Sequence, residues 1–340
     1  MRMAVTLADV ARLAGVSPAT VSRVINDSAK KVAPELRERV LAAVAQLHYV
    51  PNAHAQNVAR PRKSAVGVIV HDVSDPYFAE ITRGLQRQAA AHDRLLVICN
   101  SYREPERELA YVALLRAQQV HALILAGSGY HDDEFTARLN GELNAYQQGG
   151  GRVAVIGRHE LVGSAVLPAN EAGAYELGCR VLGLGHRRFG VIAGPRALTT
   201  TTDRLSGVRR AADELGVPLP AERIVYADFT RDGGAAAAAE LLAAAPDLTA
   251  ILALNDSMAV GTLATLRERG IAVPGRISVT GFDDMPIARD VTPALTTVRL
   301  PLVDMGERAM ALALGDDAGP LSEPAPADVI WRESCAASTS

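Results

Sequence analysis

The sequence has 340 residues, of which 49% are hydrophobic and 21% charged, and this composition is typical of a globular protein with a small and a large domain. No apolar run reaches the roughly 18 residues that a membrane-spanning helix requires, and the N-terminus carries no secretory signal pattern. The three cysteines, Cys99, Cys179 and Cys335, have neither an even count nor metal-ligand spacing. We therefore expect a cytoplasmic protein without a disulfide, a metal or another cofactor, and without a membrane partner.

The net charge of −3 is unevenly distributed along the chain. Residues 1–63 contain ten Lys or Arg and four Asp or Glu, a net charge of +6, whereas residues 64–340 carry −9. A high density of positive charge favours a polyanionic partner such as nucleic acid. The asymmetry therefore predicts that the N-terminal segment, and not the rest of the chain, binds such a partner.

The stretch TLADVARLAGVSPATVSRVIN near the N-terminus predicts two short helices joined by a tight turn. Thr6 can cap the first helix, with Asp9 at the reciprocal position of a capping box. Gly15 permits the turn, and Ser17 caps a second helix that begins at Pro18, where no backbone N–H is needed. Valine and alanine side chains at helical spacing face inward on both helices. The stretch is therefore interpreted as a helix-turn-helix.

The outward face of the second helix carries small side chains and one arginine: Pro18, Ala19, Thr20, Ser22 and Arg23. Such a face fits into the major groove of DNA, where arginine can bind guanine O6 and N7 bidentately. The alternative is an ordinary helical hairpin, which would not need the Gly-Val-Ser turn and would be richer in Glu/Lys pairs. We therefore expect DNA binding, with Arg23 as the strongest single contact.

A third helix is expected over residues 34–47, and its apolar positions can close a small core with the first two helices. Ala33, directly before this helix, cannot cap it with its side chain. Residues 53–59 can form only a short helix, which is marginal in isolation and would fold against DNA. The expected boundaries are 1–51 for the helix-turn-helix domain and 52–63 for the hinge helix and linker.

From residue 65 onward, short apolar runs alternate with amphipathic helical stretches, in two series of similar length. Buried strands that alternate with helices predict parallel sheets with right-handed crossovers. We therefore expect an α/β core of two doubly wound lobes. The expected ranges within the core, 64–340, are 64–162 with 293–322 for the first lobe, and 163–290 with 325–340 for the second. Ligands of such lobes bind at the carboxyl ends of the strands.

The candidate ligand residues follow the apolar runs and combine polar side chains with aromatic rings: Asp75, Tyr77, Phe78, Arg158, Thr200, Arg204, Phe229, Asn255 and Asp283. Arginine and aspartate suit the vicinal hydroxyls of a sugar, because a hydrogen bond to a charged group contributes about 1.5–3 kcal/mol. Two alternatives stay open: Phe78 as a core residue, and Arg204 with Asp283 as a structural salt bridge.

Several motifs lie along the chain: TLADVARLAGVSPATVSRVIN at 6–26, YVPN at 49–52, SDPYFAEITRGLQRQA at 74–89, GHRRFGVIAGP at 185–195, RLSGV at 204–208, LNDSMAVG at 254–261, GFDD at 281–284, PALTTV at 293–298 and WRES at 331–334. Together they resemble the LacI/GalR family of bacterial transcription repressors over essentially the whole chain. The resemblance implies a helix-turn-helix head, a hinge helix and a two-lobed core similar to periplasmic sugar-binding proteins. It also implies a homodimer that binds a pseudo-palindromic operator and responds to an effector in the cleft.

The resemblance implies the following DNA contacts: Thr6, Ser17, Pro18, Ala19, Thr20, Ser22, Arg23, Asn26, Tyr49, Asn52, His54, Ala55 and Val58. Val58 stands where the family usually inserts a leucine into the minor groove, and a shorter wedge unstacks the bases less. Leu198 stands where purine-binding members have an arginine, which favours a sugar or polyol effector. A purine or nucleoside stays the alternative, because Phe229 and the other aromatic residues would also fit a flat base.

Two other functional classes fit the sequence less well. The motifs GxSxG, HExxH and GxxxxGK[ST] are absent, so we do not expect an enzyme. A stand-alone sugar-binding protein for transport would need a signal peptide and would not need the basic N-terminal segment. The sequence therefore predicts a DNA-binding repressor whose operator affinity is controlled by an effector. Whether the effector releases or promotes DNA binding is left open.

Overall fold

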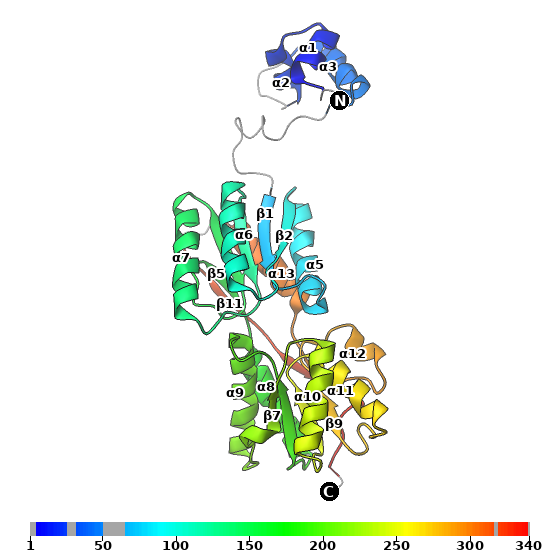
Figure 1. Ribbon diagram of the computed structural model, residues 1–340. Helices are drawn as coiled ribbons and strands as arrows, with labels where there is room; N and C mark the ends of the chain where they lie inside the picture. The colour runs from blue at the N-terminus through cyan, green and yellow to red at the C-terminus, as the bar shows by residue number, and fades with distance from the viewer. Residues whose placement is uncertain (1–4, 26–31, 50–64, 316–318, 339–340) are drawn as a thin grey trace. The chain divides into compact units, whose positions relative to one another are not determined.

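The computed structural model describes residues 5–25, 32–49, 65–315 and 319–338. The chain divides into two compact units, residues 1–63 and residues 64–340 (Figure 1). Five predicted DNA contacts, and with them the expected hinge helix, lie outside the described residues: Asn26, Asn52, His54, Ala55 and Val58. In the part of the chain that is described, no helix has both the length and the apolar composition needed to cross a bilayer.

The N-terminal unit contains three helices: α1 (Leu7–Ala14), α2 (Pro18–Ile25) and α3 (Pro34–Gln46). The predicted capping box is present, because Thr6 accepts from the backbone N–H of Asp9 and the Asp9 carboxylate accepts from the backbone N–H of Thr6. Gly15 ends α1 in the left-handed region, at φ 64°, and so permits the turn into α2. α3 begins after Ala33 without a side-chain cap. Small apolar side chains form the core of this unit: Val10, Ala11, Ala14, Val21, Val24, Val40 and Ala43.

The first lobe of the larger unit is a parallel sheet with the strand order β11-β5-β4-β3-β1-β2. Its strands are β1 (Ala65–Val70), β2 (Leu95–Asn100), β3 (Ala122–Ala126), β4 (Arg152–Ile156), β5 (Ser164–Pro168) and β11 (Ser322–Ala325). Its helices are α5 (Pro76–Ala91), α6 (Pro105–Ala117), α7 (Asp133–Gln148) and α13 (Leu302–Leu314). Successive β1 side chains, Val68 and Ile69, belong to different hydrophobic clusters on the two faces. Because helices cover both faces, the strands appear in the sequence as continuous apolar runs.

The second lobe is a smaller parallel sheet with the order β7-β6-β8-β9. Its strands are β6 (Phe189–Ala193), β7 (Ile224–Tyr226), β8 (Ala250–Ala253) and β9 (Ser278–Thr280), with the 3-10 turn η1 (Ala221–Arg223) before β7. Its helices are α8 (Asn170–Gly183), α9 (Thr199–Glu214), α10 (Arg231–Ala244), α11 (Asp256–Glu268) and the short α12 (Ile287–Asp290). α8 packs against α9, and α10 against α11. A separate antiparallel pair is formed by β10 (Thr297–Arg299) and β12 (Asp328–Ile330).

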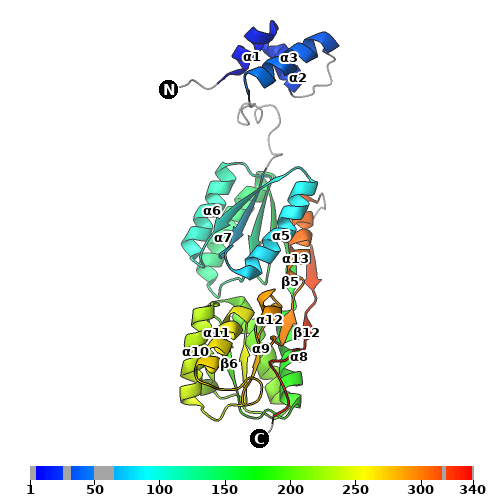
Figure 2. The same cartoon turned by 90° about the vertical axis from the view of Figure 1, so that its right-hand side faces the viewer.

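The chain passes between the lobes three times within residues 65–315 and 319–338: from β5 to α8, from β10 to α13 and from β11 to β12 (Figure 2). The expected lobe ranges were therefore wrong in detail. Residues 163–168, expected in the second lobe, contain β5, which pairs with β4 and β11 in the first sheet. Residues 293–300, expected in the first lobe, extend the second, where Thr296 bridges Thr280 of β9. Strands of this length look alike in either sheet, so only their pairing decides which lobe they join.

Candidate functional site

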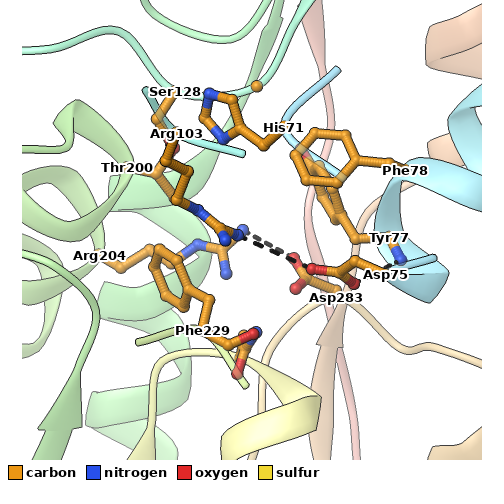
Figure 3. Close-up of a pocket in the computed structure, with 12 residues that line it drawn as sticks. His71, Asp75, Tyr77, Phe78, Arg103, Ser128, Thr200, Arg204, Phe229 and Asp283 are labelled. Carbon is orange, nitrogen blue, oxygen red and sulfur yellow. Dashed lines mark hydrogen bonds and ion pairs between the residues drawn. The ribbon is translucent and has the colours of Figure 1, made fainter. Parts of the chain in front are cut away.

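A pocket lies between the two lobes at the carboxyl ends of their strands, with about 380 Å³ of empty space, part of which is open to solvent (Figure 3). This interlobe pocket is lined by every candidate ligand residue of the sequence except Arg158. Four further residues complete the lining: His71, Arg103, Gly127 and Ser128. The rule that ligands of doubly wound sheets bind at strand ends therefore located the pocket correctly.

Arg204 and Asp283 form a buried ion pair in the wall of the pocket (Figure 3). Nη2 of Arg204 donates to Oδ1 of Asp283 at 2.7 Å, and both side chains are 3% exposed. The guanidinium also donates to Oδ1 of Asn170 and to the carbonyl of Leu254, and it lies 3.9 Å from the centre of the Phe282 ring. Burial raises the pKa of Asp283 to about 6, although the adjacent Arg204 lowers it. The pair is held by protein groups, as a structural salt bridge would be. It also faces the pocket, as an effector contact would.

The start of α5 contributes an acid and two aromatic rings to the pocket (Figure 3). Asp75 accepts from the backbone N–H of Tyr77 at 3.0 Å, and Arg103 lies 3.9 Å from its other oxygen. Burial raises the pKa of Asp75. Tyr77 and Phe78 pack edge to face with their centroids 5.0 Å apart, and Phe78 belongs to the hydrophobic core while it lines the pocket. Phe229 provides an aromatic wall from the second lobe.

Sequence reasoning missed the polar residues that follow β1, β2 and β3. Burial, together with the positive charge of Arg103, lowers the pKa of His71 to about 3, so this imidazole is neutral at physiological pH. Gly127 has φ 139°, and a Cβ there would lie 2.9 Å from the His71 ring. Ser128 donates to Oγ1 of Thr200 at 2.7 Å and so joins the two lobes. Applying the strand-end rule to every strand would have identified these residues.

The sequence predicts Arg158 as an effector contact, but Arg158 does not line the interlobe pocket. Arg158 follows β4, but its guanidinium forms a bidentate pair with Asp203 of α9, with Nη2 2.7 Å from Oδ1. The Arg158 side chain is 45% exposed and lies outside the interlobe pocket. β4 is closer than β1 and β3 to the β11 edge of the sheet, which explains why its end lies apart from the pocket.

The described DNA-contact candidates of the N-terminal unit are exposed or half-buried: Thr6, Ser17, Pro18, Ala19, Thr20, Ser22, Arg23 and Tyr49. Ser17 accepts from the backbone N–H of Thr20 at 3.2 Å, which holds the first turn of α2 in place. Val21 and Val24 of α2 are buried in the core of the unit. The opposite face of α2, which carries Arg23, is therefore left accessible.

Known proteins share this architecture along the whole chain. The family of bacterial regulatory proteins of the lacI type matches residues 6–52, and the periplasmic binding protein-like domain matches residues 180–335. The transcriptional regulator GalS of Salmonella typhimurium is 39% identical over 319 residues, which cover 93% of this chain and 91% of GalS. The chain belongs to the lacI family.

Two solved lacI-family structures extend the comparison. The transcriptional regulator CelR in complex with cellobiose is 30% identical, with a TM-score of 0.70 and coverage of 97% of this chain and 99% of CelR. The lac repressor dimer bound to operator and the anti-inducer ONPF is 26% identical, with a TM-score of 0.84 and coverage of 98% and 100%. This lacI-family member is a DNA-binding transcriptional regulator and not an enzyme. The predicted family and fold class are confirmed.

Proposed function

We propose that this protein is a homodimeric repressor that acts in the cytoplasm, and that a sugar or sugar derivative in the interlobe pocket controls its affinity for operator DNA. The lining of that pocket carries the proposal, because it places charged hydrogen-bonding groups beside aromatic rings. Small-molecule sites commonly combine apolar walls with a few polar groups that orient the ligand. A sugar offers both surfaces, since its hydroxyls lie at the edge of an apolar ring.

Each part of the pocket supplies one kind of contact in this proposal. Arg204 and Asp283 present a donor and an acceptor side by side, an arrangement that matches two adjacent hydroxyls. Asp75 supplies a second acceptor near Arg103. Phe229 provides a flat apolar wall. The remaining proposed effector contacts are Tyr77, Phe78, Thr200 and Asn255.

Relatives support a carbohydrate effector. CelR is solved with cellobiose, and a lacI-family regulator from Enterococcus faecium, 25% identical to this chain, is solved with ribose. A purine effector has less support, because Leu198, which stands in place of the arginine of purine-binding members, is 2% exposed and does not line the pocket. The dimeric lac repressor on its operator supports the proposed homodimer.

The proposed operator contact is the exposed face of α2 in the major groove, with Arg23 bound to a guanine. Further proposed contacts are Thr6, Ser17, Pro18, Ala19, Thr20, Ser22, Asn26, Tyr49, Asn52, His54, Ala55 and Val58. The test begins with binding sites selected from random duplexes, followed by fluorescence anisotropy of the full chain. Arg23→Ala should weaken binding by about 10- to 100-fold, the worth of one bidentate base contact.

The matched control for this test is Arg12→Ala. It removes the same charge from α1, where Arg12 already pairs with Asp9 at 3.1 Å. We expect it to reduce operator affinity by no more than about threefold. Equal losses of operator affinity in the two variants would mean that Arg23 contributes only its charge. That result would contradict the proposed base contact.

The effector is tested by thermal unfolding of the full chain against sugars, polyols, nucleosides and nucleobases. A ligand that binds the folded state raises its melting temperature, so a shift with a sugar or polyol supports the proposal. A shift with nucleosides alone would favour the purine alternative, and a complete panel without a shift would overturn the sugar assignment. Operator anisotropy with and without the active compound then gives the sign of the coupling.

A further inference from the structure

A second pocket lies beside the interlobe pocket, with about 490 Å³ of empty space, part of which is open to solvent. It is formed by α6, the segment after β3, the start of α7, the segment after β4 and Thr199 at the start of α9. Thr199 belongs to the second lobe, and the other elements belong to the first. The second pocket therefore has walls from both lobes, as the interlobe pocket does.

Two polar atoms in this lining have no hydrogen-bond partner among the described residues. They are Oε2 of Glu108, on α6, and the hydroxyl of Tyr130, after β3. Both atoms are shielded from solvent, and the Glu108 residue is only 4% exposed. A buried polar group without a partner costs about 1–3 kcal/mol, and more for a charged group. Two such atoms in one cavity indicate that a hydrogen-bonding occupant belongs there.

The charge of the second pocket favours a cation. Glu108, Asp133 and Glu160 contribute carboxylates to its lining, whereas the guanidinium of Arg158 is already neutralised by Asp203. His159 adds no charge, since burial lowers its pKa to about 4. Burial also raises the pKa of Glu108 to about 7, because the ionised carboxylate loses its hydration there. A cation beside Glu108 would replace that lost stabilisation.

Apolar side chains form the rest of the lining. Phe135 and Leu139 of α7 belong to the core cluster on this face of the sheet and also line the second pocket. No group of three or more His, Cys, Asp or Glu within the described segments is arranged to bind a metal ion. Apolar walls beside the Glu108 carboxylate favour an organic cation with a small alkyl part.

We propose that the second pocket binds a small alkylammonium ion, whose ammonium group donates to Oε2 of Glu108 and to the hydroxyl oxygen of Tyr130 and whose alkyl chain packs on Phe135 and Leu139. An ammonium group has several donors, so one group can satisfy both unpaired acceptors. The contact with ionised Glu108 is a charge-assisted hydrogen bond, which is about twice as strong as a neutral one.

Tyr130 connects this site to the interlobe pocket. Its ring centroid lies 5.2 Å from that of Phe135 in the second pocket and 6.1 Å from that of His71 in the interlobe pocket. The backbone of Tyr130 also bridges Leu198 of the second lobe. An alkylammonium ion at this position would therefore contact the wall shared by the two pockets.

The test is isothermal titration calorimetry of the full chain with n-butylammonium chloride, with 1-butanol as the neutral ligand of the same shape. We expect one butylammonium ion per protomer, and an affinity for 1-butanol at least about tenfold lower. Glu108→Gln, which keeps the side-chain shape, should weaken butylammonium binding at least about tenfold, and Tyr130→Phe about three- to tenfold. Glu104→Gln is the matched control at the start of the same helix, where Glu104 is exposed and pairs with Arg107, and it should leave the affinity within about twofold.

Three results would overturn the proposal: no butylammonium binding to the wild type, equal binding of 1-butanol, or undiminished binding to Glu108→Gln. Operator anisotropy of each variant shows that the protein is folded, and it reports on the proposed repressor function separately. Butylammonium binding can therefore be absent while operator binding is observed. Operator binding can likewise be absent while butylammonium binds.

Discussion

Arg204 of α9 and Asp283, after β9, meet at 2.7 Å in a wall where both side chains are only 3% exposed. The guanidinium is fixed by two further hydrogen bonds to protein groups before any ligand arrives. A ligand that binds beside this pair therefore meets charges that are already oriented, and it loses less free energy to the ordering of side chains.

Removing Arg204 should affect both stability and effector binding. Arg204→Ala leaves Asp283 buried without its partner, and breaking a buried ion pair in this way costs about 3–5 kcal/mol of the free energy of unfolding. We also expect a loss of effector affinity of at least about 100-fold, because charged hydrogen bonds to the ligand disappear. Urea unfolding and calorimetry measure the two effects. Arg204→Lys, which keeps the charge without the planar fork, should still lose affinity, and retained affinity would contradict the proposed contact.

Arg158→Ala should be mild, in contrast to Arg204→Ala. Its pair with Asp203 is bidentate but 45% exposed on the Arg158 side, and exposed pairs contribute about 0.2–1 kcal/mol. Because Arg158 does not line the interlobe pocket, the effector dissociation constant should change by no more than about fivefold. A loss comparable to that of Arg204→Ala, measured in the same titration, would show that Arg158 contacts the ligand after all.

Glu108 should make the protein less stable as the pH rises. Burial raises its pKa from 4.5 to about 7, so between these values the folded protein binds more protons than the unfolded chain does. The free energy of unfolding therefore falls across this range, by on the order of 3 kcal/mol. Glu108→Gln should lack this component and gain stability relative to the wild type at about pH 8. Urea unfolding of both proteins at about pH 4.5, 6 and 8 measures the difference, and parallel pH profiles would contradict the prediction.

Gly15→Ala should destabilise the helix-turn-helix and leave the core intact. Gly15 has φ 64°, and a Cβ there would lie 2.5 Å from Nη2 of Arg39. An L-residue in the left-handed region costs about 1–2 kcal/mol, so amide hydrogen exchange in α1 and α2 should accelerate and operator affinity should fall.

Gly141→Ala is the control for this substitution. Gly141 lies within α7, where a Cβ would meet no neighbouring heavy atom within 4 Å, so alanine should stabilise the core by about 0.4–1 kcal/mol. Unchanged exchange in α1 and α2 of Gly15→Ala would show that the turn tolerates a side chain.

Local patterns predicted the elements well, because each is determined by its own residues. The capping box of Thr6 and Asp9 appears as expected, and the run AVGVIV at 65–70 is β1. The pocket was also predictable, because parallel strands end at the same edge of a sheet and so bring together the residues that follow β1, β6 and β9.

The order of strands within a sheet could not be obtained from the sequence. Arg158 follows a strand just as Ser128 does, yet only Ser128 reaches the interlobe pocket, because β3 lies next to β1 and β4 one position farther away. The lobe assignment of β5 and β10 failed for the same reason. Pairing between distant segments decides both the order of the strands and the lobe to which each strand belongs. Hydrophobic periodicity carries no information about this pairing.

The edge strand β11 completes the first sheet from near the end of the chain. Its neighbour β5 belongs to a much earlier segment, as shown by the backbone N–H of Leu321, which donates to the hydroxyl of Ser164, 157 residues away in sequence. On the ribosome, the sheet of the first lobe is therefore completed only after all four strands of the β7-β6-β8-β9 sheet in the second lobe have been translated. Until residue 325 has emerged, β5 presents an unpaired edge to which other nascent chains can add a strand.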